Sequence, residues 1–165
     1  MTEIRSLTQF TMDDLRHLVL SGYTSSARYQ VRKNETDEIT SFTLELVQLD
    51  TPYVKYDKLS DEVLLGIALA EVQTWSNRLW VWEFYIDPAY RGQGIGTQLM
   101  GELILRNRQR GLRAILLETQ TTNVPAIRFY RKMGFTLDGI HLSQYSNNDY
   151  PDDEICLYMM RNLQD

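Results

Sequence analysis

The sequence contains a single cysteine, Cys156, in 165 residues. One cysteine without a Cys-x-x-Cys pair excludes a disulfide framework and a structural zinc cluster, and it fits a reducing compartment. The longest apolar run, Val63–Ala70, has eight residues, whereas a membrane-spanning helix needs about 20. The segment Met1 to Phe10 includes charged side chains and lacks the apolar stretch of a signal peptide. We therefore expect a cytoplasmic protein with no membrane partner and no metal.

Basic residues are in the minority, since 17 Lys and Arg stand against 22 Asp and Glu and give a net charge of −5. This sign disfavours contact with a phosphate backbone, so no nucleic-acid partner is expected. The rest of the composition is that of a globular protein, with 43% hydrophobic and 24% charged residues. Without internal repeats or a Pro/Gly/Ser-rich linker, the chain is expected to form one domain over residues 1–165.

The spacing of apolar residues predicts a mixed α/β or α+β sheet with helices on both faces. The expected strands are Glu3–Leu7, Phe42–Val47 ended by Thr51-Pro52, Val63–Val72, Leu79–Asp87, Leu112–Glu118, Phe135–Ser143 and Glu154–Met160. The expected helices are one beginning near Thr11, one with a loop in Gly22–Glu38, Thr97–Arg110 ended by Gly111, and one from Asn123 to Gly134. Turn residues at Thr74–Asn77 predict an antiparallel hairpin between the two central strands.

A glycine-rich segment, Arg91–Gly96, follows a predicted strand and opens a predicted helix. The first N–H groups of a helix lack intrahelical partners, and glycine lets the backbone approach a diphosphate closely. A dinucleotide fingerprint starting at Gly92 would need glycine at position 97, where Thr97 stands. A P-loop would need Gly-Lys-Ser/Thr after the second glycine, which is also missing. The remaining readings are a different phosphate site or a strand-to-helix turn without a ligand.

Two spaced motifs resemble those of the GNAT superfamily of N-acetyltransferases. The first is Arg91-x-x-Gly94-x-Gly96, within EFYIDPAYRGQGIGTQLM, and the second is Asn123-x-x-Ala126-x-x-x-Tyr130 followed by Gly134-Phe135. The resemblance implies a GNAT fold, with a central mixed, mostly antiparallel twisted sheet of six to seven strands flanked by about four helices. It also implies a strand–helix–strand site for acetyl-CoA as co-substrate.

The resemblance further implies which residues bind the co-substrate. The pantetheine arm would lie along the strand Phe84–Ile86, and the diphosphate would meet the main chain of the turn. The implied cofactor-binding residues are Phe84, Tyr85, Ile86, Arg91, Gly92, Gln93, Gly94, Ile95, Gly96, Thr97, Asn123 and Tyr130. For Asn123 two readings stand side by side, a bond to pantetheine and a helix cap.

Two residues are expected to carry the proton transfers of the reaction. Tyr130 stands where many family members have the acid that protonates the leaving thiolate, and a phenol can donate to a thiolate of slightly lower pKa. Its alternative is a ring that only packs on the sheet. Glu83 is the candidate base for the incoming ammonium, since it is a carboxylate in an otherwise apolar run. Its alternative is a chain of water molecules.

A narrower resemblance is to streptothricin acetyltransferases, carried by SFTLELVQLDTPYVKYD, LLETQ and the acidic segment before the last strand. It implies a small, cationic amine acceptor, with Trp82 and Glu83 lining the acceptor pocket. The residues Asp149, Asp152 and Asp153 would steer the cation, or else form a solvated loop. Acetylation of a protein or peptide is the alternative activity, and a non-catalytic acyl-CoA-binding regulator is the alternative of another class. Family members that pair through edge strands also make a homodimer an expectation.

Overall fold

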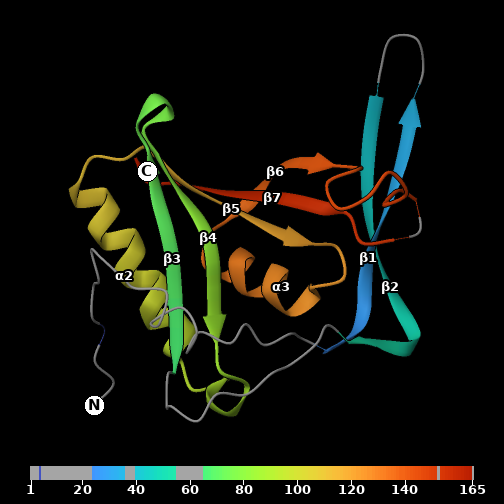
Figure 1. Cartoon of the computed structure of the whole chain (residues 1–165), viewed down its shortest axis with the longest axis horizontal. Coiled ribbons are helices and arrows are strands. Elements are labelled where there is room, and N and C mark those ends of the chain that lie inside the picture. Colours follow the sequence, from blue (N-terminus) through green and yellow to red (C-terminus); the bar gives the residue numbers. More distant parts are fainter. Residues whose placement is uncertain (1–3, 5–23, 36–39, 55–64, 152, 165) are drawn as a thin grey trace. The chain divides into compact units, whose positions relative to one another are not determined.

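The computed structural model of the chain describes residues 4, 24–35, 40–54, 65–151 and 153–164 (Figure 1). Contacts divide the chain into two compact units, one of residues 1–23, 55–115 and 163–165 and one of residues 24–54 and 116–162. Seven strands form two sheets. One sheet pairs β1 (Thr24–Glu35) with β2 (Thr40–Val54), and the other has the order β3 (Gly66–Gln73), β4 (Arg78–Ile86), β5 (Ala114–Gln120), β7 (Cys156–Asn162) and β6 (Thr136–His141). The described residues hold two α-helices, α2 (Ile95–Gln109) and α3 (Val124–Lys132). The predicted mixed sheet of six to seven strands is confirmed.

In the first unit, an antiparallel hairpin packs against one helix. The hairpin consists of β3 (Gly66–Gln73) and β4 (Arg78–Ile86), joined by a 3-10 turn over Thr74–Ser76. Asn77 takes a left-handed conformation with φ 49°, which is why the predicted turn closes here. The helix α2 (Ile95–Gln109) contacts both strands. Its Met100 and Ile104 are buried, and Gly111 follows it with φ +73°, as the sequence predicts.

The second unit places one helix among the remaining strands. Besides the sheet of β1 and β2, its elements are β5 (Ala114–Gln120), which begins in the first unit, α3 (Val124–Lys132), β6 (Thr136–His141) and β7 (Cys156–Asn162), with β6 and β7 antiparallel. The largest side chains that this unit buries fully are Leu117, Ile127, Phe135, Ile155, Leu157 and Met159. Gly134 ends α3 with φ +82°, as predicted.

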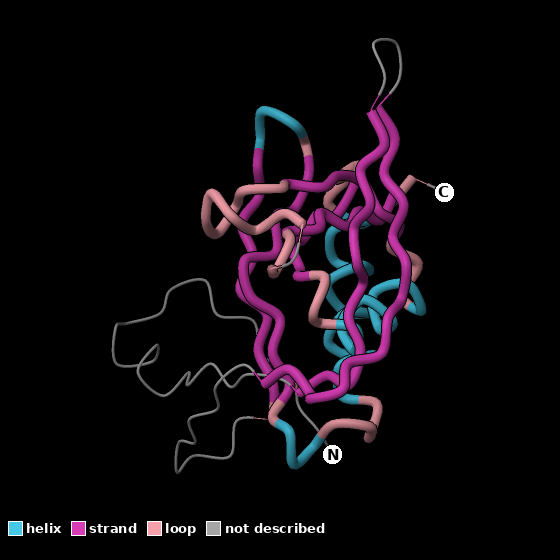
Figure 2. Tube along the Cα trace, turned by 90° about the vertical axis from the view of Figure 1, so that its right-hand side faces the viewer, coloured by secondary structure: helices cyan, strands magenta, loops and turns pink. Residues whose placement is uncertain are grey.

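The predicted helix and loop within Gly22–Glu38 are wrong, because residues 24–35 form the strand β1 (Thr24–Glu35). Ala27 and Val31 are buried, whereas most of the residues between them are polar and only partly covered. The strand exists because it pairs along its length with β2 (Thr40–Val54), as Figure 2 shows. The partner is the next strand in the chain, but the polar side chains of residues 28–30 and 32–35 hide the alternation that would have indicated a strand.

The strand predicted to stop at Thr51-Pro52 continues to Val54. The register explains how, because Ser25 pairs with Tyr53 while Ala27 pairs with Gln48, which leaves residues 49–52 without partners in the ladder. Proline has no N–H to donate, and a bulge is where a strand accommodates it. The predicted strand Glu3–Leu7 and the predicted helix near Thr11 lie outside the described residues, so two of the four expected helices are seen.

Candidate functional site

The turn between β4 and α2 is held by its own polar side chains. Asp87 accepts a hydrogen bond from the N–H of Ala89 at 2.8 Å and starts a 3-10 turn over Pro88–Tyr90. The Nε of Arg91 donates to the carbonyl of Ile86 at 2.9 Å. These bonds fix the approach to the glycines while leaving the glycine main chain exposed.

Gly92 and Gly94 take left-handed conformations, with φ +76° and +84°. An L side chain at either position would be strained, although a Cβ there would meet nothing within 4 Å. Gly94 is the N-cap of α2, and no side chain caps the helix. The glycines therefore serve an exposed, open helix start, which is the arrangement that binds the phosphates of a ligand.

On β4, the pairing with β3 is irregular beside the predicted base. Leu69 pairs with Glu83 and Ala70 with Val81, so Trp82 is an extra residue in the ladder. Trp82 is 58% exposed and its Nε1 donates to Glu71 at 3.2 Å, while Glu83 is half-buried. Phe84–Ile86, the predicted pantetheine strand, stays paired with Gly66–Ala68. A bulge of this kind re-aims side chains, here next to Glu83.

Tyr130 and Asn123 lie at opposite ends of α3. The side chain of Asn123 accepts the N–H of Ala126 at 3.3 Å and so caps the helix, which is one of its two predicted roles. Tyr130 is buried, and its ring contacts Phe129 and Phe135 at centroid distances of 5.5 and 5.8 Å. The packing fixes the ring, and donation by its hydroxyl stays a prediction.

The acidic segment contains two kinds of carboxylate. Asp149 is buried and accepts the Ser146 hydroxyl at 2.6 Å and the Tyr145 N–H at 2.7 Å. Burial alone would raise the pKa of Asp149, but these hydrogen bonds outweigh it, and the pKa is lowered. Asp153 is exposed and accepts the N–H of Glu154. Asp152 lies outside the described residues.

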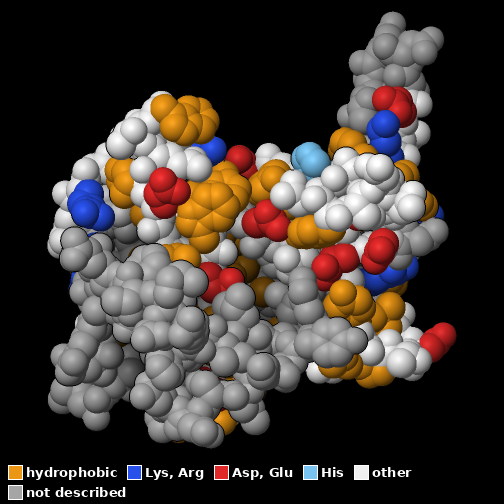
Figure 3. Space-filling view, viewed as in Figure 1, with side chains coloured by type: hydrophobic (Ala, Val, Ile, Leu, Met, Phe, Trp, Pro, Cys, Tyr) orange, Lys and Arg blue, Asp and Glu red, His pale blue; other side chains and the backbone are white. Residues whose placement is uncertain are grey.

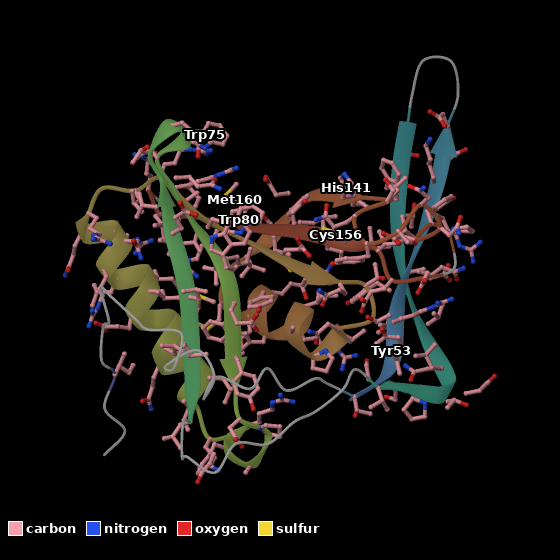
Figure 4. All side chains as sticks on the ribbon, in the orientation of Figure 1. Tyr53, Trp75, Trp80, His141, Cys156 and Met160 are labelled. Carbon is pink, nitrogen blue, oxygen red and sulfur yellow. The ribbon has the colours of Figure 1, made fainter. Side chains whose placement is uncertain are left out.

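One polar cluster was missed at the level of sequence. The hydroxyl of Tyr145 donates to Glu118 on β5 at 2.8 Å. The negative charge of Glu118 also acts on Tyr158 and Cys156 on β7. Burial and the charge of Glu118 raise the pKa of Cys156 to about 11, and burial, Cys156 and Glu118 together raise the pKa of Tyr158 to about 12. Cys156 is labelled in Figure 4. A glutamate directly after four apolar residues of β5 was the one available signal.

The predicted site residues fall in both units. The first unit brings together Trp82–Ile86 and the glycine turn, and the second contains Asn123, Tyr130 and the acidic segment. Acidic and hydrophobic side chains are exposed on the face drawn in Figure 3. Among the described residues, no group of three His, Cys, Asp or Glu side chains is placed to hold a metal ion. No helix in the described part of the chain is long and apolar enough to cross a membrane.

Known acetyltransferases are similar to this chain in sequence and in structure. The chain is 35% identical over 100 residues to streptothricin acetyltransferase from Streptomyces lavendulae. The matched region covers 61% of this chain and 52% of that protein. The structure of nourseothricin acetyltransferase matches with a TM-score of 0.75 and 29% identity, over 93% of this chain and 95% of the other. A Bacillus anthracis protein solved in complex with acetyl coenzyme A has the same fold, with a TM-score of 0.69, 22% identity and coverage of 93% and 96%.

These matches confirm the predicted resemblance to GNAT enzymes and to streptothricin acetyltransferases. The chain spans between half and three fifths of the length of the curated relatives it matches first. The profile of the acetyltransferase (GNAT) family matches residues 13–135, which is most of the sequence, and the chain therefore belongs to that family.

Proposed function

We propose that the protein transfers an acetyl group from acetyl-CoA to a primary amine of a small cationic molecule of the streptothricin type. The observation that carries this proposal is the open glycine turn, in which two left-handed glycines leave space above the uncapped start of α2. The turn can present bare N–H groups to a diphosphate, as CoA requires. The similarity to streptothricin and nourseothricin acetyltransferases supports the acceptor class.

The residues present fit the acyl donor in two places. The main chain from Arg91 to Thr97 would hold the diphosphate, and the backbone of Phe84–Ile86 would line the pantetheine arm. The donor supplies an acetyl group activated as a thioester. A backbone N–H of β4 would hydrogen-bond the thioester carbonyl, and a donor of this type contributes about 2.7–4 kcal/mol to lowering the barrier.

The chain's own side chains would handle the protons. Glu83, half-buried next to the bulge at Trp82, would take the proton from the incoming ammonium, so that a neutral amine attacks. Tyr130, fixed by its two aromatic neighbours, would donate its hydroxyl proton to the departing sulfur. Trp82 is exposed beside Glu83 and would line the acceptor pocket.

The test is a binding measurement followed by turnover. Acetyl-CoA should raise the melting temperature of the protein, and release of CoA thiol should then depend on added streptothricin. Preferential turnover of peptides with free N-termini would replace the acceptor class by a protein or peptide. Tight binding of acetyl-CoA with no turnover across a broad amine panel would instead indicate a non-catalytic acyl-CoA-binding regulator. No stabilisation by acetyl-CoA would refute the proposal altogether.

A further inference from the structure

The second unit holds a carboxylate with no cationic partner. Glu118 is half-buried on β5, between the buried Leu117 and Thr119. Among the described residues it forms no ion pair, and its Oε1 accepts a hydrogen bond from the hydroxyl of Tyr145 at 2.8 Å. A partly desolvated carboxylate without a cation is unfavourable in a structure unless something else compensates for it.

The negative charge of Glu118 contributes to the raised pKa values of three neighbouring side chains. Burial, the neighbouring Cys156 and the negative charge of Glu118 raise the pKa of Tyr158 to about 12. Burial and the charge of Glu118 raise the pKa of Cys156 to about 11. Burial, the hydrogen bond to Glu118 and the charges of Cys156 and Glu118 raise the pKa of Tyr145 as well.

A chain of hydrogen bonds holds this carboxylate in place. The buried carboxylate of Asp149 accepts the backbone N–H of Tyr145 at 2.7 Å, and the Tyr145 hydroxyl in turn donates to Glu118. The hydroxyl of Tyr158 donates to Gln144 at 3.5 Å, next to Tyr145 in the chain. The buried Asp149 thus contributes to the position of Tyr145, and the hydroxyl of Tyr145 bonds one of the two oxygens of Glu118.

We propose that Glu118, hydrogen-bonded to the hydroxyl of Tyr145, binds an ammonium group of the acceptor other than the one that is acetylated. The inference rests on the proposed function and deepens it, since it makes the preferred acceptor a molecule with at least two amines. A carboxylate and tyrosine rings together are the groups that recognise an alkylammonium. Glu118 stabilises the charged form of an amine, which suits a cation that stays protonated and not the neutral amine that attacks.

Kinetics of the full chain with streptothricin as acceptor test the proposal. In Glu118→Gln, the KM for the acceptor should rise about 10- to 100-fold, the range expected for loss of a bond between charged groups. The KM for acetyl-CoA and kcat should stay within about threefold of the wild type. The matched control is Asp138→Asn, which removes the same charge from an exposed position on β6 and should leave both KM values unchanged.

A second variant separates the charge from the fold. Tyr145→Phe keeps the ring and the backbone bond to Asp149 but removes the hydroxyl, and it should raise the acceptor KM less than Glu118→Gln does. If wild-type protein acetylates streptothricin and Glu118→Gln retains the wild-type acceptor KM, the inference is wrong while the proposed function stands.

Calorimetry tests the inference without turnover. Wild-type protein should bind lysine amide, with two ammonium groups, about tenfold more tightly than norleucine amide, which has one. Glu118→Gln should bind both equally. Equal affinities in the wild type, or no binding of lysine amide, would overturn the inference whatever the outcome of the turnover assays.

Discussion

The two described helices begin in opposite ways. At α3, the side chain of Asn123 accepts the N–H of Ala126, and Pro125 in the first turn has no N–H that needs an acceptor. At α2, the N-cap is Gly94 with φ +84°, and no side chain caps the helix. A side-chain cap stabilises a helix by about 1 kcal/mol, so α2 forgoes a contribution that α3 uses. We infer that α2 keeps its backbone donors for a ligand, whereas α3 is closed to hold its own residues.

The acidic segment shows the same contrast on a smaller scale. Both oxygens of Asp149 are hydrogen-bonded within the loop, whereas Asp153 is exposed. Polar groups that are hydrogen-bonded within the protein should contribute to its stability. Polar groups that are exposed to solvent should contribute to the binding of a ligand.

The largest effect on kcat is expected at Tyr130, the predicted proton donor, which lies on the capped helix α3. Tyr130→Phe should lower kcat by about 10²–10⁴ because it removes the proton donor and keeps the packed ring. The melting temperature should hardly change, since the contacts with Phe129 and Phe135 remain. Tyr29→Phe, in the same unit, is the control for loss of a tyrosine hydroxyl. A twofold effect on kcat would reduce Tyr130 to a packing residue.

The second-largest effect is expected when a side chain is introduced at the uncapped start of α2. Gly94→Asp places a carboxylate where the diphosphate is expected, and it forces a side chain onto a left-handed backbone. The Kd for acetyl-CoA should rise about 100-fold or more, the equivalent of two lost hydrogen bonds to a charged group. Gly101→Asp is the matched control, because its Cβ would also meet nothing within 4 Å but lies inside α2. Unchanged affinity in Gly94→Asp would refute the assignment of the turn.

Removal of the side-chain cap of α3 should lower the stability of the protein. Asn123→Ala removes the cap of α3, and the free energy of unfolding should fall by about 1 kcal/mol, or about 2–4 °C in melting temperature. The Kd for acetyl-CoA separates the two predicted roles of Asn123. A cap alone leaves it unchanged, whereas a bond to pantetheine would make it rise as well.

The buried carboxylate of the acidic segment should give a pH-dependent contribution to stability. The pKa of Asp149 is lowered in the folded state, so its stabilising effect is present above the ordinary pKa of about 3.9 and is lost as the pH falls through the lowered value. Asp149→Asn should therefore melt below the wild type at pH 7, and the difference should shrink toward pH 3. The exposed Asp138→Asn is the control. A difference that grows on acidification would contradict the assignment.

How far the sequence predicts the structure depends on how local each signal is. The hairpin turn at Asn77, the cap at Asn123 and the left-handed Gly111 and Gly134 follow from chemistry within a few residues, and all are present. The glycine turn was predicted for the same reason. Its assignment to the diphosphate stays a prediction.

The features that were missed have no clear pattern of spacing in the sequence. β1 is a strand because it pairs with β2, and polar side chains conceal its buried positions Ala27 and Val31. Tyr145 and Glu118 are 27 residues apart, and only the fold brings their side chains within 2.8 Å. Spacing rules cannot detect a cluster assembled in this way.

The smallest effect is expected at the exposed carboxylate. Asp153→Asn should raise the KM for a cationic acceptor by about twofold at low salt, because a solvated charge acts through its field and is screened within about 10 Å at 0.1 M salt. The difference from wild type should vanish at high salt, where that field no longer reaches the acceptor. Asp138→Asn should show neither effect if position, and not net charge, matters. A KM difference that persists in high salt would mean that Asp153 contacts the acceptor directly, and the contrast between Asp149 and Asp153 would then be one between a structural and a binding residue.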